Sequence, residues 1–111
     1  MNERRARQRF PLRLRTQWRR WSGRPDQTWP GQTLNVSSSG LYMVTPERAL
    51  KTGERVEISV WLPLSGRPEG KCLTGSGRVI RVEPCAAGEI GVAIAMDRLG
   101  WLRGEVDLTA A

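Results

Sequence analysis

Apolar and polar residues alternate between positions 54 and 62, and this stretch constrains the fold more than any other part of the sequence. Val56, Ile58, Val60 and Leu62 share one face of an extended segment, and the residues between them are mostly polar. Successive side chains of a β-strand point to opposite sides, so a period of two predicts a strand with one buried face. The chain is therefore expected to be built from half-buried β-strands.

Turn-forming residues divide the rest of the chain into further short segments of this kind. Six strands are predicted, at about 11–21, 28–36, 41–45, 54–62, 71–83 and 90–96. Pro30 and Gly31 make the first half of the second strand an edge, a bulge or a segment that is not strand. Glycines between Gly75 and Val79 predict a bulge in the fifth strand. The stretch from 63 to 70, rich in Pro and Gly, is predicted to be a loop.

Six short strands and little helix indicate an all-β fold, a small six-stranded antiparallel β-barrel. Closure removes the exposed sheet edges that so many short strands would otherwise create. Residues 1–111 are predicted to form one domain. Within it, residues 1–10 are expected to form a flexible basic arm, 11–96 the barrel, and 97–111 a short or irregular helical tail weakened by its glycines.

Positive charge is concentrated at the start of the chain. Residues 1–24 hold nine arginines and one acidic residue, which gives this part a net charge of +8. Residues 25–111 hold nine basic and ten acidic residues, a net charge of −1. The formal charge of +7 is thus a property of the N-terminal part, and an anionic partner is expected to meet the chain there.

Composition argues against several classes of function. The chain has no histidine, which is the commonest general base and metal ligand. Its two cysteines, Cys72 and Cys85, form neither a CxxC pair nor a disulfide framework. We therefore predict no metal site and no catalytic residue, and an enzyme is the class with the least support.

The location of the protein also follows from its hydropathy. No run of residues approaches the roughly 18 apolar residues that a membrane-spanning helix needs. No apolar segment follows the basic N-terminus, as it would in a secretory signal. A cytoplasmic protein without membrane insertion is expected.

Two polar motifs carry the chemistry of the chain. Arg5-Ala6-Arg7-Gln8-Arg9 is an RxxxR sequence in the arm, one of four RxxxR pairs with Arg9/Arg13, Arg15/Arg19 and Arg20/Arg24. Asn35-Val36-Ser37-Ser38-Ser39-Gly40 is an NxSxxG sequence at the corner after the second strand. Asn and Ser favour turns, and Gly40 is able to adopt a positive φ or to let a ligand approach the backbone closely. Arginine binds phosphate bidentately and also stacks on bases or donates to guanine O6 and N7. These residue types suit the binding of a nucleotide with more than one phosphate.

In combination, the two motifs resemble the PilZ domain family, bacterial modules that bind the second messenger cyclic di-GMP. Gly77-Arg78-Val79-Ile80-Arg81-Val82 and the segment 88–94 are similar to the last hairpin of that family. The resemblance implies that cyclic di-GMP is the ligand, that no further cofactor is used, and that the arm closes over a ligand held at the corner. The ligand-binding residues that it implies are Arg4, Arg5, Arg9, Asn35, Ser37 and Gly40. An additional cation at Arg4 favours two stacked ligand molecules per chain.

The resemblance also implies signalling through a protein partner that the sequence does not identify. Ordering of the arm by the ligand would change the surface that this partner contacts. One alternative is a basic β-barrel that binds DNA or RNA through the arm and a face formed by Arg13, Arg15 and Arg19. It has less support, because the strands carry no ladder of aromatic and basic residues. A second alternative is a PilZ-fold interaction module that binds no ligand.

The five tryptophans have two expected roles. Trp18, Trp61 and Trp101 are expected to fill the barrel or its rim, since large aromatic side chains bury much apolar surface. Trp21 and Trp29 lie near the first turn, either beside the ligand or on a partner surface.

Overall fold

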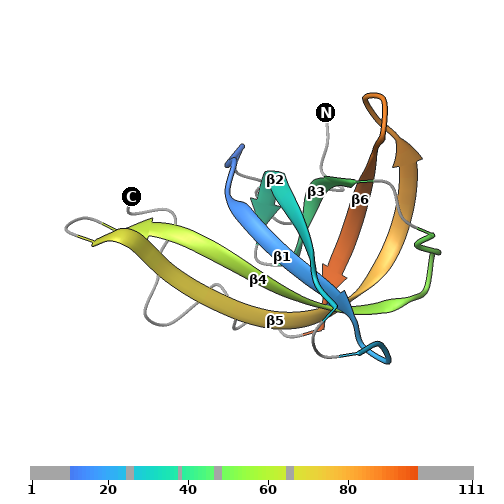
Figure 1. Cartoon of the computed structure of the whole chain (residues 1–111), viewed down its shortest axis with the longest axis horizontal. Helices are drawn as coiled ribbons and strands as arrows, with labels where there is room; N and C mark the ends of the chain where they lie inside the picture. Colours follow the sequence, from blue (N-terminus) through green and yellow to red (C-terminus); the bar gives the residue numbers. More distant parts are fainter. Residues whose placement is uncertain (1–10, 25–26, 38, 47–48, 65–66, 98–111) are drawn as a thin grey trace.

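The protein folds as a closed barrel of six antiparallel strands in a computed structural model that describes residues 11–24, 27–37, 39–46, 49–64 and 67–97. The strands are β1 (Arg15–Arg20), β2 (Trp29–Ser37), β3 (Gly40–Pro46), β4 (Arg55–Leu64), β5 (Arg67–Pro84) and β6 (Glu89–Met96). Their order around the barrel is β1-β2-β3-β6-β5-β4 (Figure 1). The predicted six-stranded antiparallel barrel is confirmed. Apart from Asp97, the predicted helical tail lies outside the described residues.

Two pairings between strands that are not neighbours in the sequence close the barrel. β1 pairs with β4, with Trp18 opposite Ile58. β3 pairs with β6, with Gly40 opposite Ala95 and Leu41 opposite Ile94. The second pairing places the β2–β3 corner directly beside β6, although more than 50 residues separate Gly40 from Ala95 along the chain. Closure of the barrel therefore decides which surface surrounds the corner.

The barrel is filled by the inward-facing side chains of the alternating strands. The side chains that are almost completely buried include Trp18, Val36, Met43, Val56, Ile58, Val60, Leu62, Val79, Val92 and Ile94. The alternation recognised in β4 is thus the alternation between core and surface. Because hydrophobic burial is the main favourable contribution to folding, these residues account for most of the stability of the barrel.

Trp18 is the largest fully buried side chain and confirms the expected role of a tryptophan in the barrel. Its indole N–H donates to Thr45 Oγ1 at 2.9 Å, and the ring of Trp29 lies 4.7 Å away, centroid to centroid. Trp61 differs from the prediction because its neighbours Val60 and Leu62 point inward, which leaves Trp61 on the outer face. Trp101 lies outside the described residues.

The β4–β5 hairpin is longer than the sequence suggests and projects beyond the rest of the barrel (Figure 1). The predicted loop from 63 to 70 is wrong, because β4 continues to Leu64 and β5 begins at Arg67. The ladder accommodates Pro63 through a change of register between Leu62 and Leu64. Gly70 takes a φ of +73°, and a Cβ there would lie 2.3 Å from the carbonyl oxygen of Leu62. The proline and glycine mark an irregularity within the hairpin rather than its end.

Three smaller details of the strands were also left open or placed differently by the sequence. Pro30 and Gly31 lie within β2 and pair with Gln17 and Thr16 of β1, so this half of the strand is formed. The bulge predicted between Gly75 and Val79 occurs slightly later, between Val79 and Arg81. β1 begins at Arg15 rather than at position 11.

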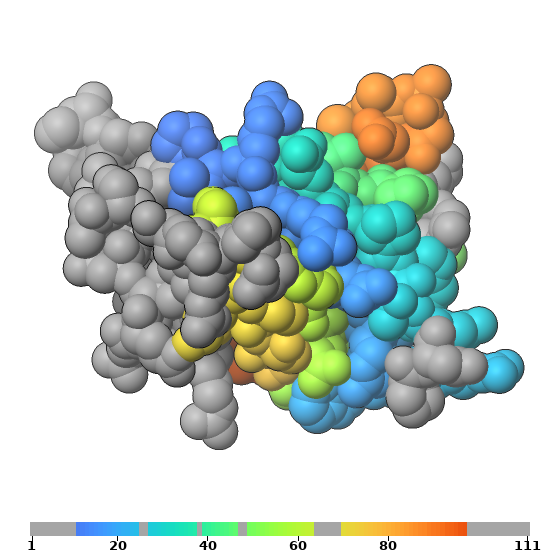
Figure 2. Space-filling view, turned by 60° about the vertical axis from the view of Figure 1, so that its left-hand side comes forward, coloured from blue at the N-terminus to red at the C-terminus, as the bar shows by residue number. Residues whose placement is uncertain are grey.

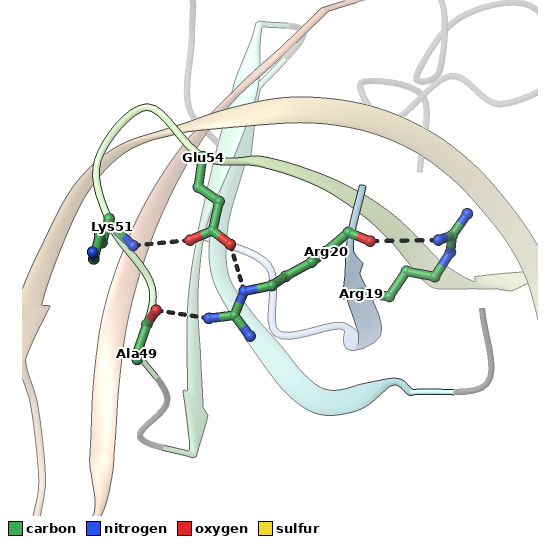
Figure 3. A network of polar contacts seen from close by, with 5 residues as sticks. All are labelled: Arg19, Arg20, Ala49, Lys51 and Glu54. Atoms are coloured by element: carbon green, nitrogen blue, oxygen red, sulfur yellow. Dashed lines mark hydrogen bonds and ion pairs between the residues drawn. The ribbon is translucent and has the colours of Figure 1, made fainter. Parts of the chain in front are cut away.

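Arg20, at the end of β1, anchors the connection between β3 and β4 (Figure 3). Its Nε is paired with Glu54, and its Nη2 donates to the carbonyl oxygen of Ala49 at 2.7 Å. Glu54 in turn accepts from the backbone N–H of Lys51 at 3.1 Å. A substitution of Arg20 would disturb this connection as well as the surface charge, so Arg20 is not a neutral control for ligand binding.

Candidate functional site

The β2–β3 corner is held by hydrogen bonds of its own serines. Ser37 is buried, and its hydroxyl accepts from the backbone N–H of Ser39 at 3.2 Å and lies 3.1 Å from Ser39 Oγ. It also lies 3.4 Å from the carbonyl oxygen of Gly40, to which it donates. The backbone carbonyl of Ser39 accepts from Met96 N–H at 2.9 Å, which ties the corner to β6. Ser37, Ser39 and Gly40 are therefore tied to one another and to β6 by these hydrogen bonds.

Position 40 requires glycine because β3 and β6 pack closely there, and not because the backbone takes a conformation that only glycine adopts. The described glycines with positive φ are Gly53, Gly70 and Gly88, so the expectation of a positive φ at Gly40 is wrong. A Cβ at Gly40 would lie 2.2 Å from the carbonyl oxygen of Ile94 on β6. Only glycine lets β3 approach β6 this closely. The predicted contact of Gly40 with a ligand remains a prediction.

Thr33 connects the start of β1 to the strand that carries the corner. Its Oγ1 accepts from Leu14 N–H at 2.8 Å and donates to the carbonyl oxygen of Leu12 at 2.6 Å. Its own N–H donates to the carbonyl oxygen of Leu14 at 2.9 Å. Thr33 precedes Asn35 by two residues, and the register shifts between them. The sequence pattern did not single out Thr33, since a threonine in a strand is ordinary.

Thr33 thereby fixes the root of the arm beside the corner. Arg4, Arg5 and Arg9 lie outside the described residues, so their roles remain predictions. Arg9 precedes Leu12 by three residues, and an extended chain spans at most about 3.6 Å per residue. Arg9 is thus close in sequence to Leu12, which the structure fixes beside β2, and the approach of the arm to the corner stays a prediction.

A small hollow opens on the outer surface next to the corner. Its volume is about 140 Å³, and it is lined by Asn35, Ser37, Ser39, Gly40, Leu41, Ile80, Ala93, Ile94 and Ala95. The structure thus brings together three of the predicted site residues, Asn35, Ser37 and Gly40. Ala93 and Ala95 provide a low floor on β6, and Ile80 stands at its edge in the β5 bulge, with 53% of its surface exposed.

The sequence motifs did not identify Ser39, Ile80, Ala93 and Ala95 as members of this site. The one signal that the sequence offered was an apolar residue, Ile80, next to the predicted bulge. The others depend on the β3–β6 pairing, which the local sequence does not reveal.

Two larger hollows lie elsewhere and contain none of the motif residues that line the corner. Their volumes are about 550 and 480 Å³, and Arg13 contributes to both. The first lies beside Arg15 and Trp61, and the second beside Gln32 and Glu89. Figure 2 shows β1, in blue, beside β4, in yellow-green, on one face of the molecule, with β5, in yellow, next to β4. Both hollows carry polar side chains, but neither is lined by Asn35, Ser37 or Gly40.

The arginines that follow along β1 are engaged within the protein. The guanidinium carbon of Arg15 lies 4.2 Å from the centre of the Trp61 ring. Arg19 Nε lies 2.8 Å from Glu57 Oε1, and Arg20 is paired with Glu54. Of the basic face that the nucleic-acid alternative requires, Arg19 is thus paired with an acidic residue, while Arg15 stays exposed over Trp61.

The described residues hold no group of three or more Cys, Asp or Glu side chains that would bind a metal ion. Cys72 and Cys85 are both exposed, free thiols. Among the same residues there is no helical segment with the length and hydrophobicity of a membrane-spanning helix.

One titratable pair lies beside the corner, on the outer surface of β3 and β5. Tyr42 donates its hydroxyl to Glu83 Oε2 at 2.7 Å. Burial, together with this hydrogen bond, raises the pKa of Tyr42 to about 12. The same bond and the nearby Arg81 lower the pKa of Glu83. Because the pKa of Tyr42 is higher in the folded chain, the stability that its neutral form contributes is complete below pH 10 and is lost as the pH rises toward 12.

This shift is directly measurable, because Tyr42 is the only tyrosine of the chain. We expect the tyrosinate absorbance of the folded protein to rise with a midpoint near pH 12, and that of the denatured protein near pH 10. The substitution Glu83→Gln removes the negative acceptor and should lower the midpoint in the folded protein, while burial keeps it above 10. A wild-type midpoint near 10 under folded conditions would show that the Tyr42–Glu83 bond does not form in solution.

Comparison with known proteins places this geometry in a family. The model of the PilZ domain family matches residues 3–100, which is most of the chain. No curated protein sequence matches the chain significantly.

Two solved structures share the fold. The Bacillus subtilis inhibitor of motility MotI/DgrA superposes with a TM-score of 0.70 at 15% sequence identity, over 86% of this chain and 43% of the MotI/DgrA chain. The PilZ domain of CeSA from a cellulose-synthesizing bacterium superposes with a TM-score of 0.58 at 21% identity, over 85% of this chain and 86% of that chain. This chain thus corresponds to less than half of MotI/DgrA and to nearly all of the CeSA domain.

The family match covers both motifs, the β2–β3 corner and the β5–β6 hairpin, and the barrel agrees with that of a solved PilZ domain. The chain therefore belongs to the PilZ domain family, a family of cyclic di-GMP receptor domains.

Proposed function

We propose that the protein is a receptor for cyclic di-GMP that binds its ligand between the N-terminal arm and the β2–β3 corner, without catalysis. In this proposal Arg4, Arg5 and Arg9 supply the cations. The arrangement of Thr33 carries the proposal. The hydrogen bonds of its hydroxyl with Leu12 and Leu14 hold the segment that leads from the arm into β1 beside β2, the strand that carries the corner. The cytoplasmic location expected from the sequence belongs to the same proposal.

The chemistry of the corner supports a compact ligand with phosphates and flat bases. Asn35 and the serine hydroxyls offer both donors and acceptors. The alanine floor on β6 leaves space above it for a planar group, and Ile80 offers an apolar edge. Arginines from the arm would close over the phosphates with charge-assisted hydrogen bonds. With a further cation at Arg4, we propose that two stacked ligand molecules bind per chain.

Binding would be transmitted to a protein partner through the arm. A ligand that contacts several arginines of the arm would restrict it to one arrangement and so present a different surface. MotI/DgrA, which shares the fold, is an inhibitor of motility. A similar role as an adaptor that controls motility, polysaccharide export or virulence is consistent with this proposal.

The alternative of nucleic-acid binding has weaker support. Its basic face would need Arg13, Arg15 and Arg19 to contact a phosphate backbone. Arg19 is instead paired with Glu57 and Arg15 lies over Trp61. An interaction module that binds no ligand is the remaining alternative. A titration with cyclic di-GMP distinguishes it from the proposed receptor.

The test is a calorimetric titration of the 111-residue chain with cyclic di-GMP at low and at physiological salt. We expect saturable binding that persists at the higher salt, because few phosphates are involved and counterion release is small. A stoichiometry near two would support stacked ligands. The variants Arg5→Ala and Arg9→Ala should each weaken binding by about 1.5–3 kcal/mol, the range of a hydrogen bond to a charged group.

Arg78→Ala is the matched control for these variants. Arg78 is exposed and lies opposite Ala95 on β6, but it does not line the hollow, and its Nη1 donates to the carbonyl oxygen of Gly53 at 3.3 Å. It removes the same charge as the arm variants and should leave the affinity nearly unchanged. Absence of binding to the wild-type chain at both salt concentrations would overturn the proposed function.

A further inference from the structure

A row of outward-facing residues continues the candidate site across the barrel. Asn35 on β2 lies opposite Tyr42 on β3, Tyr42 opposite Ala93 on β6, and Ala93 opposite Arg81 on β5. Neighbouring strands are about 4.8 Å apart, so Asn35 and Arg81 are separated by about 14 Å along the curved sheet. The NxSxxG motif includes Asn35, and Ala93 and Arg81 lie in the segments that resemble the last hairpin of the family, but none of Tyr42, Ala93 and Arg81 is among the residues that the resemblance implies for ligand binding.

Tyr42 is held flat in the middle of the row. Its hydroxyl donates to Glu83 Oε2 at 2.7 Å. A Cβ placed on Gly91 would lie 1.9 Å from the Tyr42 hydroxyl oxygen, so the phenol ring lies directly over this glycine of β6. The ring is thus fixed at its hydroxyl end. A fixed, partly exposed aromatic ring is a suitable support for a planar base.

Arg81 lies at the far end of the row with its donors near Tyr42. Its Nε lies 3.1 Å from Glu83 Oε1, and its guanidinium carbon lies 5.9 Å from the centre of the Tyr42 ring. The side chains of Arg81 and Glu83 are 56% and 44% exposed. A pair this exposed is weak, because water screens both charges. An anionic or acceptor group on a ligand is able to compete with Glu83 for Arg81.

Tyr42 and Arg81 lie on the outer face of the barrel, next to the hollow beside the corner. The serine corner bounds that hollow at one end and Ile80 bounds it at β5, where Arg81 follows Ile80 along the strand. The bulge between Val79 and Arg81 leaves Ile80 exposed at this edge. A ligand held by the arm and the corner would extend over β3 and β6 toward Arg81.

We propose that Arg81 and Tyr42 are additional binding residues for the dinucleotide, an inference that rests on the proposed function. Arg81 exchanges its contact with Glu83 for hydrogen bonds to acceptor atoms of the ligand, while the Tyr42 ring supports a base. The acceptors are either phosphate oxygens or the O6 and N7 atoms of guanine, which a guanidinium contacts in the same bidentate way. Glu83 keeps both Arg81 and Tyr42 in position when no acceptor is bound.

The test compares Arg81→Gln with Arg78→Gln in titrations of the same chain with cyclic di-GMP. Both substitutions remove one exposed arginine of β5, but only Arg81 lies in the row of Tyr42. We expect Arg81→Gln to raise the Kd about tenfold or more, as for loss of a charge-assisted contact, and Arg78→Gln to change it less than about twofold. Equal Kd values for wild type and Arg81→Gln, or equal losses in both variants, would overturn this inference and leave the proposed function intact.

Titration with cyclic di-AMP identifies the acceptor, since adenine carries an amino group in place of the guanine O6. A loss confined to cyclic di-GMP would show that Arg81 binds the guanine edge, and a loss with both ligands would show that it binds phosphate. Both results support the inference. Absence of cyclic di-GMP binding to the wild type would overturn the proposed function and this inference together.

A second measurement examines Tyr42 without mutation. Because it is the only tyrosine, incorporation of fluorotyrosine gives a single fluorine NMR signal. We expect saturating cyclic di-GMP to shift this signal in the wild-type chain. An unchanged signal in a chain that calorimetry shows to be saturated would exclude Tyr42 from the site.

Discussion

Replacing Gly40 by alanine is expected to lower the free energy of unfolding by about 3 kcal/mol, the upper part of the range for overpacking a close contact. The added Cβ would lie 2.2 Å from the carbonyl oxygen of Ile94, a backbone atom that cannot rotate away. Relief requires β3 and β6 to separate where Gly40 is opposite Ala95. That separation would also weaken the bond from Met96 N–H to the carbonyl oxygen of Ser39. Urea denaturation followed by tryptophan fluorescence measures the loss.

Gly88→Ala is the control for this substitution. Gly88 has a φ of +78°, but a Cβ there would meet nothing within 4 Å. Its replacement should cost only about 1 kcal/mol, the price of a left-handed conformation for alanine. If Gly40→Ala retained wild-type stability and lost only ligand binding, the glycine would act by admitting the ligand, as the motif alone suggests.

The expected result changes how the motif is interpreted. A glycine at the end of NxSxxG suggests a turn or a close approach of ligand, and local sequence offers no third explanation. The structural reason lies on β6, because Ile94 and Ala95 belong to a strand that pairs with β3 only when the barrel closes. Loss of binding in a Gly40 variant would therefore not by itself demonstrate a contact between this residue and the ligand.

Period-two alternation was sufficient to predict the strands and most of their inward faces. Val56, Ile58, Val60 and Leu62 are all buried, as their spacing predicts. Such a pattern depends only on the neighbours of each residue along the chain, which makes it readable from sequence. The exact ends of strands were less predictable, since Pro63 is accommodated in the β4–β5 hairpin by the irregularity near Gly70.

The candidate site was predictable only in part for the same reason. Asn35 and Ser37 are identified by a local motif, and the hollow beside them confirms that they lie together with Gly40. Ile80 and Ala93 join them through the pairings of β6 with β3 and β5. Small residues on an outer strand face have no distinctive sequence signal. Their role emerges only from the three-dimensional arrangement.

Replacing Thr33 by valine is expected to weaken both the barrel and, through the arm, the binding of cyclic di-GMP. Valine keeps the shape of the side chain but leaves Leu14 N–H and the carbonyl oxygen of Leu12 without their bonds to the hydroxyl. Thr33 is fully buried, so these groups lose their partner where water has little access. The expected loss of unfolding free energy is about 1–3 kcal/mol, the penalty of leaving a buried polar group unsatisfied.

Thr16→Val is a closely matched control. Thr16 is also buried in the barrel, but its hydroxyl donates only to the sulfur of Met43 at 3.6 Å, a weak acceptor. The same chemical change should therefore cost much less stability. Urea denaturation of both variants measures this difference.

The binding measurement then separates a purely structural threonine from one that positions the arm. Calorimetry without urea, at a temperature where both variants are folded, should show weaker cyclic di-GMP binding for Thr33→Val than for Thr16→Val. The reason is that Leu12, which leads into the barrel from the arm, is no longer fixed beside β2 by the Thr33 hydroxyl, although Thr33 itself touches no ligand. If Thr33→Val lost stability but bound cyclic di-GMP with wild-type affinity, the root of the arm would not contribute to the site. The ligand would then have to be held by the corner and by residues on the β5 side.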